Sequence, residues 1–505
     1  MRFYVTTPIY YVNDRPHIGH SYTTIAADIL ARHHKQRGEE TFFLTGVDEH
    51  ATKVWRAAEA AGLTAEEFVD QIGEAWRALP PKLNAETDFF IRTTDDGHKA
   101  FVREFLQRIY EAGDVYDDVY SGPYCVSCEE FKSEDELVDG KCPIHLIPAE
   151  VIEEKNYFFR LSRYQDQLLA LYDNGFVLPE FRRNEVRSFV AGGLRDFSIS
   201  RAGQPWGIPL PWDESQVAYV WADALVNYLS ALTYARPGDD LRDIFWPEVR
   251  HLVGKDIIRF HCVYWPAMLL SAGYSVPKQV FAHGWLLLDD LKISKSLGNA
   301  IDPLDLIDTY GADAIRYWCA RAVTFGQDGS ASVGDIATRY ERELGNDLGN
   351  LLSRTTAMIA RYRDGAIPGG PSAGSDLERA IADVHDQVPK LIDEFNITGA
   401  LDVVWNLVRY LNKYVTDEAP WTLAKDEANA ARLDQVLFDL AEGLRVSAIA
   451  LQPYLPETAP KILEALGQPL AFDWDRVTYG RLEPTTDVDA SAPLFPRLEA
   501  EAAAS

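Results

Sequence analysis

Short apolar segments alternate with longer helical patterns through the first half of this 505-residue chain. Residues 3–7 are β-branched and aromatic, residues 17–37 have helical periodicity, and residues 40–45 form a second apolar run. Strand, helix and strand in this order predict a parallel sheet covered by helices. Further strand patterns follow at residues 216–220, 251–253 and 279–283.

Two stretches depart from this alternation. Residues 115–155 interrupt it, which predicts an insertion, and the chain becomes helical after about Ser332. The later helices each keep one apolar face, as the spacing of Leu344, Leu348 and Leu351 indicates. We therefore predict an α/β domain that is split by a small insertion and followed by an all-α domain.

Three of the five cysteines stand with a histidine inside the insertion. Cys125 and Cys128 form a C-x-x-C pair, and Cys142 and His145 form a C-x-x-H pair. This spacing is typical of tetrahedral zinc, and four protein ligands leave no position for a water, so the predicted zinc is structural. The alternative is four residues without a metal. Five cysteines are too few for a disulfide framework.

The run Pro16, His17, Ile18, Gly19, His20 follows the first strand pattern and opens the first helix. Proline is tolerated at a helix start, and the backbone N–H groups there favour anions such as the phosphates of ATP. His17 and His20 share one side of the first turn, and Gly19 lets an adenine approach the backbone. The alternative is two surface histidines at a helix cap.

Lys292 and Lys295 lie three residues apart in the sequence K-I-S-K-S, within a loop that contains serine and glycine. Two lysines so placed can neutralise pyrophosphate as it leaves, which stabilises the transition state. Taken alone, such a loop is ordinarily solvated surface.

Together, H-I-G-H near the N-terminus and K-I-S-K-S resemble the signature of the class I aminoacyl-tRNA synthetases. Between residue 3 and about residue 460, several segments are similar to those of the methionyl-tRNA synthetases: Tyr4–Asn13, Phe43–His50, Ile199–Arg201, Tyr219–Ala224, Val253–Ile257 and Asp347–Arg354. Two positions depart from the family pattern. Ile293 stands where the family usually has methionine, and Leu225 where it often has proline.

The resemblance implies a methionine site. Asp48 would hold the ammonium group of methionine, and Arg201 would hold Asp48. The thioether pocket would comprise Ile9, Tyr11, Trp221, Ala224, Tyr228, Ile257 and His261. A polarisable sulfur gains from aromatic neighbours, which suits this set. Without the resemblance, Trp221 and Tyr228 are interpreted as ordinary core residues.

It also implies the ATP and tRNA contacts. Gly254 and Asp256, with Gly19, would contact the adenosine at the switch point of the sheet. Asn350, Arg354 and Trp421 would read the CAU anticodon, through hydrogen bonds to base edges and stacking on the indole. The alternatives for these three are a solvated polar face and a helix-end anchor.

The implied function is that of a methionine–tRNA ligase. Such an enzyme activates L-methionine with ATP and Mg²⁺ to methionyl-adenylate and transfers it to the 3′-terminal adenosine of tRNA(Met). The net charge of −28, taken alone, argues against a nucleic-acid partner, but binding depends on a local basic surface. Two alternatives are a nucleotidyl transferase of the same fold acting on a small molecule and a non-catalytic RNA-binding relative.

The expected layout is a Rossmann-type catalytic domain (1–115 and 156–290), a zinc-knuckle insertion (116–155), a K-I-S-K-S connecting region (291–340), an α-helical anticodon-binding domain (341–480) and a C-terminal tail (481–505). No apolar run reaches the ~18–20 residues that cross a bilayer. The chain begins in a strand pattern and has no leader, so we expect a cytoplasmic protein. The lack of an appended tRNA-binding domain predicts a monomer.

Overall fold

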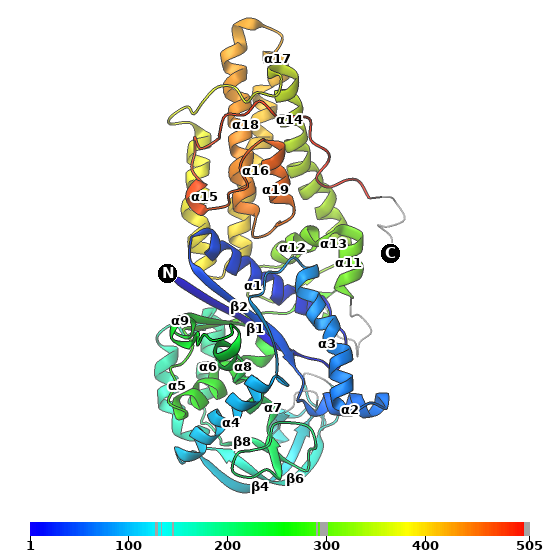
Figure 1. Cartoon of the computed structure of the whole chain (residues 1–505), viewed down its shortest axis with the longest axis vertical. Helices are drawn as coiled ribbons and strands as arrows, with labels where there is room; N and C mark the ends of the chain where they lie inside the picture. The colour runs from blue at the N-terminus through cyan, green and yellow to red at the C-terminus, as the bar shows by residue number, and fades with distance from the viewer. Residues whose placement is uncertain (127–129, 133, 144–145, 289–290, 293–300, 499–505) are drawn as a thin grey trace.

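The computed structural model describes residues 1–498 except 127–129, 133, 144–145, 289–290 and 293–300. The molecule is elongated, with a parallel sheet and its helices towards one end and a helical bundle at the other (Figure 1). Among the helices of the described residues, none combines the length and the apolar character needed to cross a bilayer.

The central sheet has six strands in the order β3-β2-β1-β11-β12-β7, and all neighbours are parallel. The strands are β1 (Arg2–Tyr11), β2 (Glu40–Asp48), β3 (Phe89–Arg92), β7 (Val177–Leu178), β11 (Val249–Gly254) and β12 (Gln279–His283). The predicted parallel α/β fold is confirmed. The chain order reverses between β1 and β11, so their carboxyl ends flank a crevice of the kind in which open α/β sheets bind ligands.

Helices cover this sheet and connect its strands. They are α1 (Ile18–Gln36), α2 (Thr52–Ala61), α3 (Ala65–Lys82), α4 (Asp96–Glu111), α5 (Gln165–Tyr172), α6 (Glu180–Ala191), α7 (Val220–Ala224), α8 (Asn227–Tyr234), α9 (Arg242–Phe245) and α10 (Trp265–Ser271). Helix α1 is buried along most of its length because it contacts β1, β2 and β11 and also α12 (Ala312–Arg321). It therefore lies between the sheet and the helical part of the chain (Figure 1).

The segment that interrupts the alternation forms an antiparallel sheet at the far end of the molecule from the bundle (Figure 1). Its strands are β4 (Val115–Cys125), β5 (Glu130–Phe131), β6 (Glu150–Phe159) and β8 (Phe197–Ser198). Two smaller sheets consist of β9 (Ser200–Ala202) with β10 (Gln216–Ala218), and of β13 (Leu286–Leu288) with β14 (Leu291–Lys292) and β15 (Gly329–Ala331).

After about Ser332 the chain is helical, as predicted, and two further helices, α11 (Pro303–Tyr310) and α12, precede this point. The helices after it are α13 (Val333–Arg339), α14 (Asn350–Arg363), α15 (Asp376–Asp393), α16 (Ile397–Glu418), α17 (Pro420–Leu423), α18 (Ala430–Leu451) and α19 (Thr458–Ala465). One hydrophobic core runs from the inner face of α1 through α12 into the bundle formed by α14, α15, α16 and α18. The sheet end and the bundle end therefore share a core.

Candidate active site

Two histidines mark the start of α1 at the carboxyl end of β1. His17 is the N-cap, and its Nδ1 accepts the N–H of Gly19 at 3.1 Å. The Nδ1 of His20 accepts the N–H of His17 at 3.1 Å, and the two ring centroids lie 3.8 Å apart. An accepting Nδ1 carries no proton, so in each neutral ring the proton sits on Nε2, which is the donor suited to a phosphate oxygen. Helix α1 begins at Ile18, so Pro16, which was expected to open the helix, lies two residues before its first residue.

Two aromatic residues that the sequence did not single out hold His20. The rings of Tyr10 and Trp76 contact it edge to face, at centroid distances of 4.9 and 4.7 Å. The Tyr10 hydroxyl also donates to the carbonyl oxygen of His20 at 3.3 Å. Trp76 comes from α3, 56 residues beyond His20 in the chain, which is why no local pattern pointed to it.

Four residues of the predicted thioether pocket lie together. The ring of Trp221 is 6.4 Å from that of Tyr11 and 6.3 Å from that of His261, edge to face in both cases. The hydroxyl of Tyr228 lies 2.7 Å from Nε2 of His261. Tyr11 belongs to β1, Trp221 to α7, and Tyr228 to α8, so the pocket forms where the sheet meets two short helices.

The protonation of His261 follows from its surroundings. Burial lowers the pKa of this imidazole to about 4. Its Nδ1 lies 3.0 Å from the carbonyl oxygen of Ile257, which can only accept, so Nδ1 carries the proton. Nε2 then accepts the hydroxyl proton of Tyr228, whose own pKa burial raises. The pair is uncharged and its hydroxyl has a fixed direction, which suits a neutral thioether.

Phe260 completes this wall and was missed by the sequence reasoning. Its ring stacks on that of Trp221 at 3.8 Å with an interplanar angle of 5°. Phe260 and His261 open η5 (Phe260–Tyr264), one turn of π-helix between two tighter helical segments. Such turns are rare and frequently occur at functional sites, but no sequence signal separates them from ordinary helix.

Asp48 ends β2 and Arg201 lies in β9, both almost fully buried. An Asp48 carboxylate oxygen accepts the N–H of His50 at 3.3 Å. Nη1 of Arg201 donates to the carbonyl oxygen of Ser200 at 2.7 Å, and its guanidinium lies over the ring of Tyr219. Asp48 also stands beside Tyr11 in the register of β1 and β2, next to the pocket.

A buried network behind the pocket was not predicted. The two carboxylate oxygens of Asp223 each lie 2.7 Å from a histidine nitrogen, Nδ1 of His50 and Nε2 of His98. Although burial opposes its charge, these two histidines keep the pKa of Asp223 below its usual range. Nδ1 of His98 lies 2.7 Å from the hydroxyl of Ser230. The network ties the end of β2 to α7, α4 and α8.

The predicted adenosine contacts lie at the carboxyl end of β11. Gly254 ends this strand, and a Cβ added there would stand 2.6 Å from the carboxylate of Asp256, so a larger residue would displace that side chain. Asp256 lies in the short turn η4 (Lys255–Ile257). Because β11 and β1 are neighbours, Gly254 and the histidines of α1 share one edge of the sheet. The backbone of Lys292 pairs with Leu287, and Lys295 lies outside the described residues.

Of the four predicted zinc ligands, Cys125 and Cys142 are described and both are buried. The other two, Cys128 and His145, lie outside the described residues. The backbone reverses beyond Cys142, whose carbonyl accepts the N–H of Leu146 at 2.8 Å. Within the part of the chain that the structure describes, no group of three or more His, Cys, Asp or Glu residues is arranged to hold a metal.

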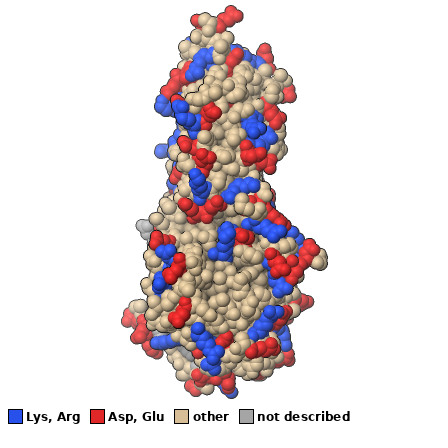
Figure 2. Space-filling view, turned by 90° about the vertical axis from the view of Figure 1, so that its left-hand side faces the viewer, with Lys and Arg blue, Asp and Glu red and all other residues tan. Residues whose placement is uncertain are grey.

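The three predicted anticodon residues lie on the surface of the bundle. Asn350 and Arg354 are both exposed on α14, and Arg354 donates to the side-chain oxygen of Asn412 on α16 at 2.9 Å. Trp421 is 44% exposed in the first turn of α17, so it follows the end of α16 but opens a new short helix. On the face shown in Figure 2, basic residues are interspersed with acidic ones along the molecule.

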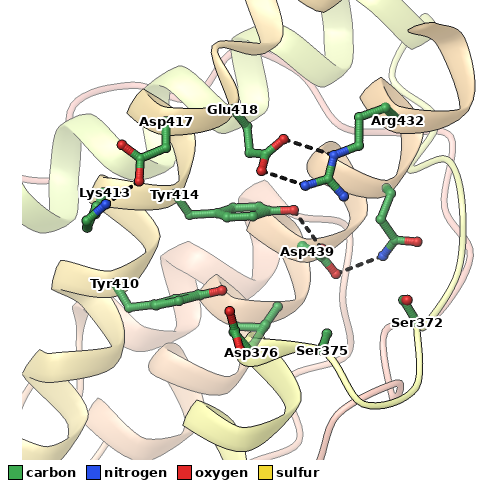
Figure 3. A pocket seen from close by; sticks show the side chains of 12 residues that line it. Ser372, Ser375, Asp376, Tyr410, Lys413, Tyr414, Asp417, Glu418, Arg432 and Asp439 are labelled. Atoms are coloured by element: carbon green, nitrogen blue, oxygen red, sulfur yellow. Dashed lines mark hydrogen bonds and ion pairs between the residues drawn. The ribbon is translucent and has the colours of Figure 1, made fainter.

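A polar hollow lies on the bundle between α15, α16 and α18 (Figure 3). Arg432 pairs with Glu418 at 2.5 Å, and Asp439 accepts the hydroxyl proton of Tyr414 at 2.9 Å. None of the predicted site residues lines it. Its two cations, Lys413 and Arg432, are each paired with a carboxylate of the same hollow, and it lies apart from the crevice of the sheet.

Comparisons with known proteins agree on one family. The family model "tRNA synthetases class I (M)" matches residues 3–147 and 144–356, and that of the "anticodon binding domain of methionyl tRNA ligase" matches residues 367–504. The methionine–tRNA ligases of Caldanaerobacter subterraneus and Streptomyces coelicolor are each 45% identical over 99% of this chain, which covers 79% and 98% of their lengths. A solved Mycobacterium tuberculosis methionyl-tRNA synthetase in complex with methionyl-adenylate is 42% identical. The two structures match with a TM-score of 0.93, and the match covers 98% of this chain and 100% of the solved chain.

Proposed function

Because the chain belongs to the methionyl-tRNA synthetase family, we propose that methionine and ATP react in the crevice between β1 and β11. The protein catalyses the ATP-dependent formation of methionyl-adenylate and the transfer of the methionyl group to tRNA(Met). The observation that carries the proposed site is the uncharged Tyr228–His261 pair, which faces Trp221 and Tyr11.

In the proposed site, the thioether enters this aromatic pocket, whose remaining walls are Ile9, Ala224 and Ile257. The hydroxyl of Tyr228 donates its proton to His261, so the pocket offers the thioether aromatic faces and no charge. The carboxylate of Asp48 holds the ammonium group, and Arg201 keeps Asp48 in place. Burial of Asp48 strengthens such an ion pair because the local dielectric is low.

In the first step, a carboxylate oxygen of methionine attacks the α-phosphorus of ATP, and the bond to pyrophosphate breaks. No general base is needed, because this carboxylate is already ionised. The Nε2–H groups of His17 and His20 contact the phosphates, and Lys292 and Lys295 stabilise the departing pyrophosphate. Mg²⁺, which would accompany ATP, would add positive charge beside the phosphates. Gly19, Gly254 and Asp256 hold the adenosine.

In the second step, a terminal ribose hydroxyl of tRNA attacks the methionyl carbonyl, and AMP leaves. Asn350, Arg354 and Trp421 bind the anticodon. The exposure of all three side chains on α14 and α17 supports this role, since a base can stack only on an accessible indole.

We also propose that Cys125, Cys128, Cys142 and His145 bind one structural zinc. The buried positions of Cys125 and Cys142 and the backbone reversal after Cys142 fit a compact knuckle. When bound, the zinc would cross-link the two ligand pairs and take no part in the reaction. The domain boundaries, the cytoplasmic location and the monomeric state stay predictions.

The pocket assignment is tested by Tyr228→Phe, with Tyr234→Phe as the matched control. Both tyrosines lie in α8, but the hydroxyl of Tyr234 donates to Asp95, away from the pocket. In ATP–pyrophosphate exchange, Tyr228→Phe should raise the KM for methionine about ten-fold, because it removes the hydrogen bond that orients His261 in the pocket wall, and leave the KM for ATP unchanged. Equal KM values for methionine in Tyr228→Phe and the wild type would contradict the assignment.

A further inference from the structure

One arginine joins three segments that are far apart in the chain. Arg316 of α12 is fully buried. Its Nη2 donates to the carboxylate of Asp28 at 2.6 Å and to the carbonyl oxygen of Pro453 at 2.5 Å. Its Nε donates to the carbonyl oxygen of Tyr454 at 3.2 Å, and its Nη1 to that of Leu83 at 3.0 Å. Every side of the guanidinium is therefore bonded.

These partners come from both ends of the molecule. Asp28 lies in α1, the helix that begins at the predicted catalytic histidines, and its carboxylate also accepts Nε of Arg32 at 2.7 Å and the N–H of Glu86 at 2.8 Å. Pro453 and Tyr454 follow α18, the central helix of the bundle. Arg316 thus connects the first helix of the active site directly to the bundle.

Two further hydrogen bonds join these helices to the bundle, one from α12 and one from α1. The carboxylate of Asp313, one turn earlier in α12, accepts the N–H of Thr458 at 2.7 Å at the start of α19. The side chain of Gln36, at the last turn of α1, donates to the carbonyl oxygen of Ile449 in α18 at 2.8 Å. All of these are directional polar contacts within an otherwise apolar core.

The chemistry of this junction fixes geometry. Apolar surfaces hold two elements together but tolerate sliding, whereas a planar guanidinium with fixed donor directions accepts only one arrangement of its partners. A buried charge is costly to desolvate, and it is retained here where two structural units meet. The junction is therefore suited to setting the distance between active site and bundle.

We propose that Arg316 is a positioning residue for the transfer step: through Asp28 it fixes the bundle relative to α1, so that a tRNA held by its anticodon presents its 3′ end to the adenylate. This inference rests on the proposed role of the bundle in anticodon binding. Adenylate formation needs only the sheet end. Transfer needs both ends at a fixed separation, and a misplacement of about 1 Å can cost about a hundred-fold in rate.

The test compares Arg316→Lys with Arg445→Lys. Lysine keeps the charge next to Asp28 but cannot reach all the carbonyl groups. Arg445 is an equally buried arginine that pairs with Glu442 at 2.7 Å and donates to two carbonyl groups, all within the bundle. For each variant we would measure the melting temperature, the kcat and KM of ATP–pyrophosphate exchange, and the kcat and KM for tRNA(Met) in aminoacylation.

Arg316→Lys should lower the kcat of aminoacylation about ten- to a hundred-fold while the KM for tRNA and both exchange parameters change less than about two-fold. Arg445→Lys should lower the melting temperature, but it should not lower the kcat of aminoacylation relative to the kcat of exchange. Equal losses of kcat in exchange and aminoacylation for Arg316→Lys, an unchanged aminoacylation kcat, or the same split in Arg445→Lys would overturn the inference. Trp421→Ala, measured alongside, reports separately on the anticodon role, because its expected effect is on the KM for tRNA.

Discussion

At the scale of single residues, burial decides the protonation of the methionine pocket. His261 has a pKa of about 4 in the folded chain and about 6.5 when exposed, because burial disfavours the imidazolium. The unfolded chain therefore binds a proton first as the pH falls. The stability that neutral His261 contributes is complete above pH 6.5 and is lost as the pH falls towards 4.

This linkage predicts the pH dependence of a His261→Gln variant. Between pH 6.5 and pH 4 the wild type should lose about 3 kcal/mol more unfolding free energy than the variant, from ~1.4 kcal/mol for each pKa unit. Urea unfolding at pH 7.5, 6, 5 and 4.5 measures the difference. The buried His283, whose pKa is also lowered by burial, is present in both proteins and cancels. Parallel stability curves would show that His261 titrates normally.

The Asp223 network gives a second residue-scale prediction. Asp223→Asn should raise the KM for methionine about ten-fold and leave the KM for ATP unchanged, because it loosens the link between the end of β2 and α7. Asp114→Asn is the control, since this buried carboxylate accepts Arg163 at 2.7 Å away from the pocket. Pyrophosphate exchange gives both KM values. A rise in the KM for ATP of the same size would contradict a specific link to methionine binding.

Some site residues were predictable from the sequence and others were not. His17 and Asp48 belong to short sequence motifs at the ends of the first two strands, so the local sequence was enough to predict them. His98, Phe260 and Trp76 act through partners that lie in other elements, and their local sequence is that of an ordinary amphipathic helix. Burial and tertiary contacts, which periodicity does not encode, give these residues their positions.

At the scale of elements, four of the six parallel strands were predicted because strands buried on both faces are continuous apolar runs, whereas the short β3 and β7 were not predicted. The strand predicted at 279–283 has those bounds in β12. The antiparallel β4 and β6 were not predicted, since their exposed faces carry many charged residues and their pairing spans the whole insertion. The strand predicted at 216–220 ends at Ala218, and helix α7 begins at Val220.

The insertion carries the zinc prediction. The purified protein should contain one zinc per chain, and Cys142→Ser should lose most of it and melt at a lower temperature. Cys262→Ser is the matched control, because Cys262 is equally buried but lies in η5, beside His261 and away from the insertion. Elemental analysis and thermal unfolding with and without a chelator provide the measurement. Full zinc content in Cys142→Ser would rule out the proposed ligand set.

At the scale of the whole molecule, the sequence predicted a helical domain but not how it attaches. Arg316 meets Asp28 and Pro453 across 288 and 137 residues of chain, and no spacing rule relates them. The net charge of −28 was also a poor guide, since acidic and basic residues are interspersed on the face in Figure 2. Local surface chemistry, not total charge, sets the tRNA contacts.

The exposed indole of Trp421 gives a prediction at this scale. Trp421→Ala should raise the KM for tRNA(Met) at least about five-fold, from the loss of ~1–3 kcal/mol of stacking, and leave pyrophosphate exchange unchanged. Phe181→Ala is the control, because this ring is similarly exposed but belongs to α6 at the other end of the molecule. Aminoacylation kinetics over a range of tRNA concentrations give the KM for tRNA(Met) of each variant. An unaffected KM for tRNA would remove Trp421 from the anticodon site.

The central claim is that the crevice between β1 and β11 activates methionine. The most direct measurement is ATP–pyrophosphate exchange by the wild-type protein with each of the twenty amino acids, without tRNA. Our account predicts exchange with methionine alone, because the wall of the pocket is aromatic and the Tyr228–His261 pair within it is uncharged. Exchange with another amino acid, or no exchange by folded protein, would contradict it.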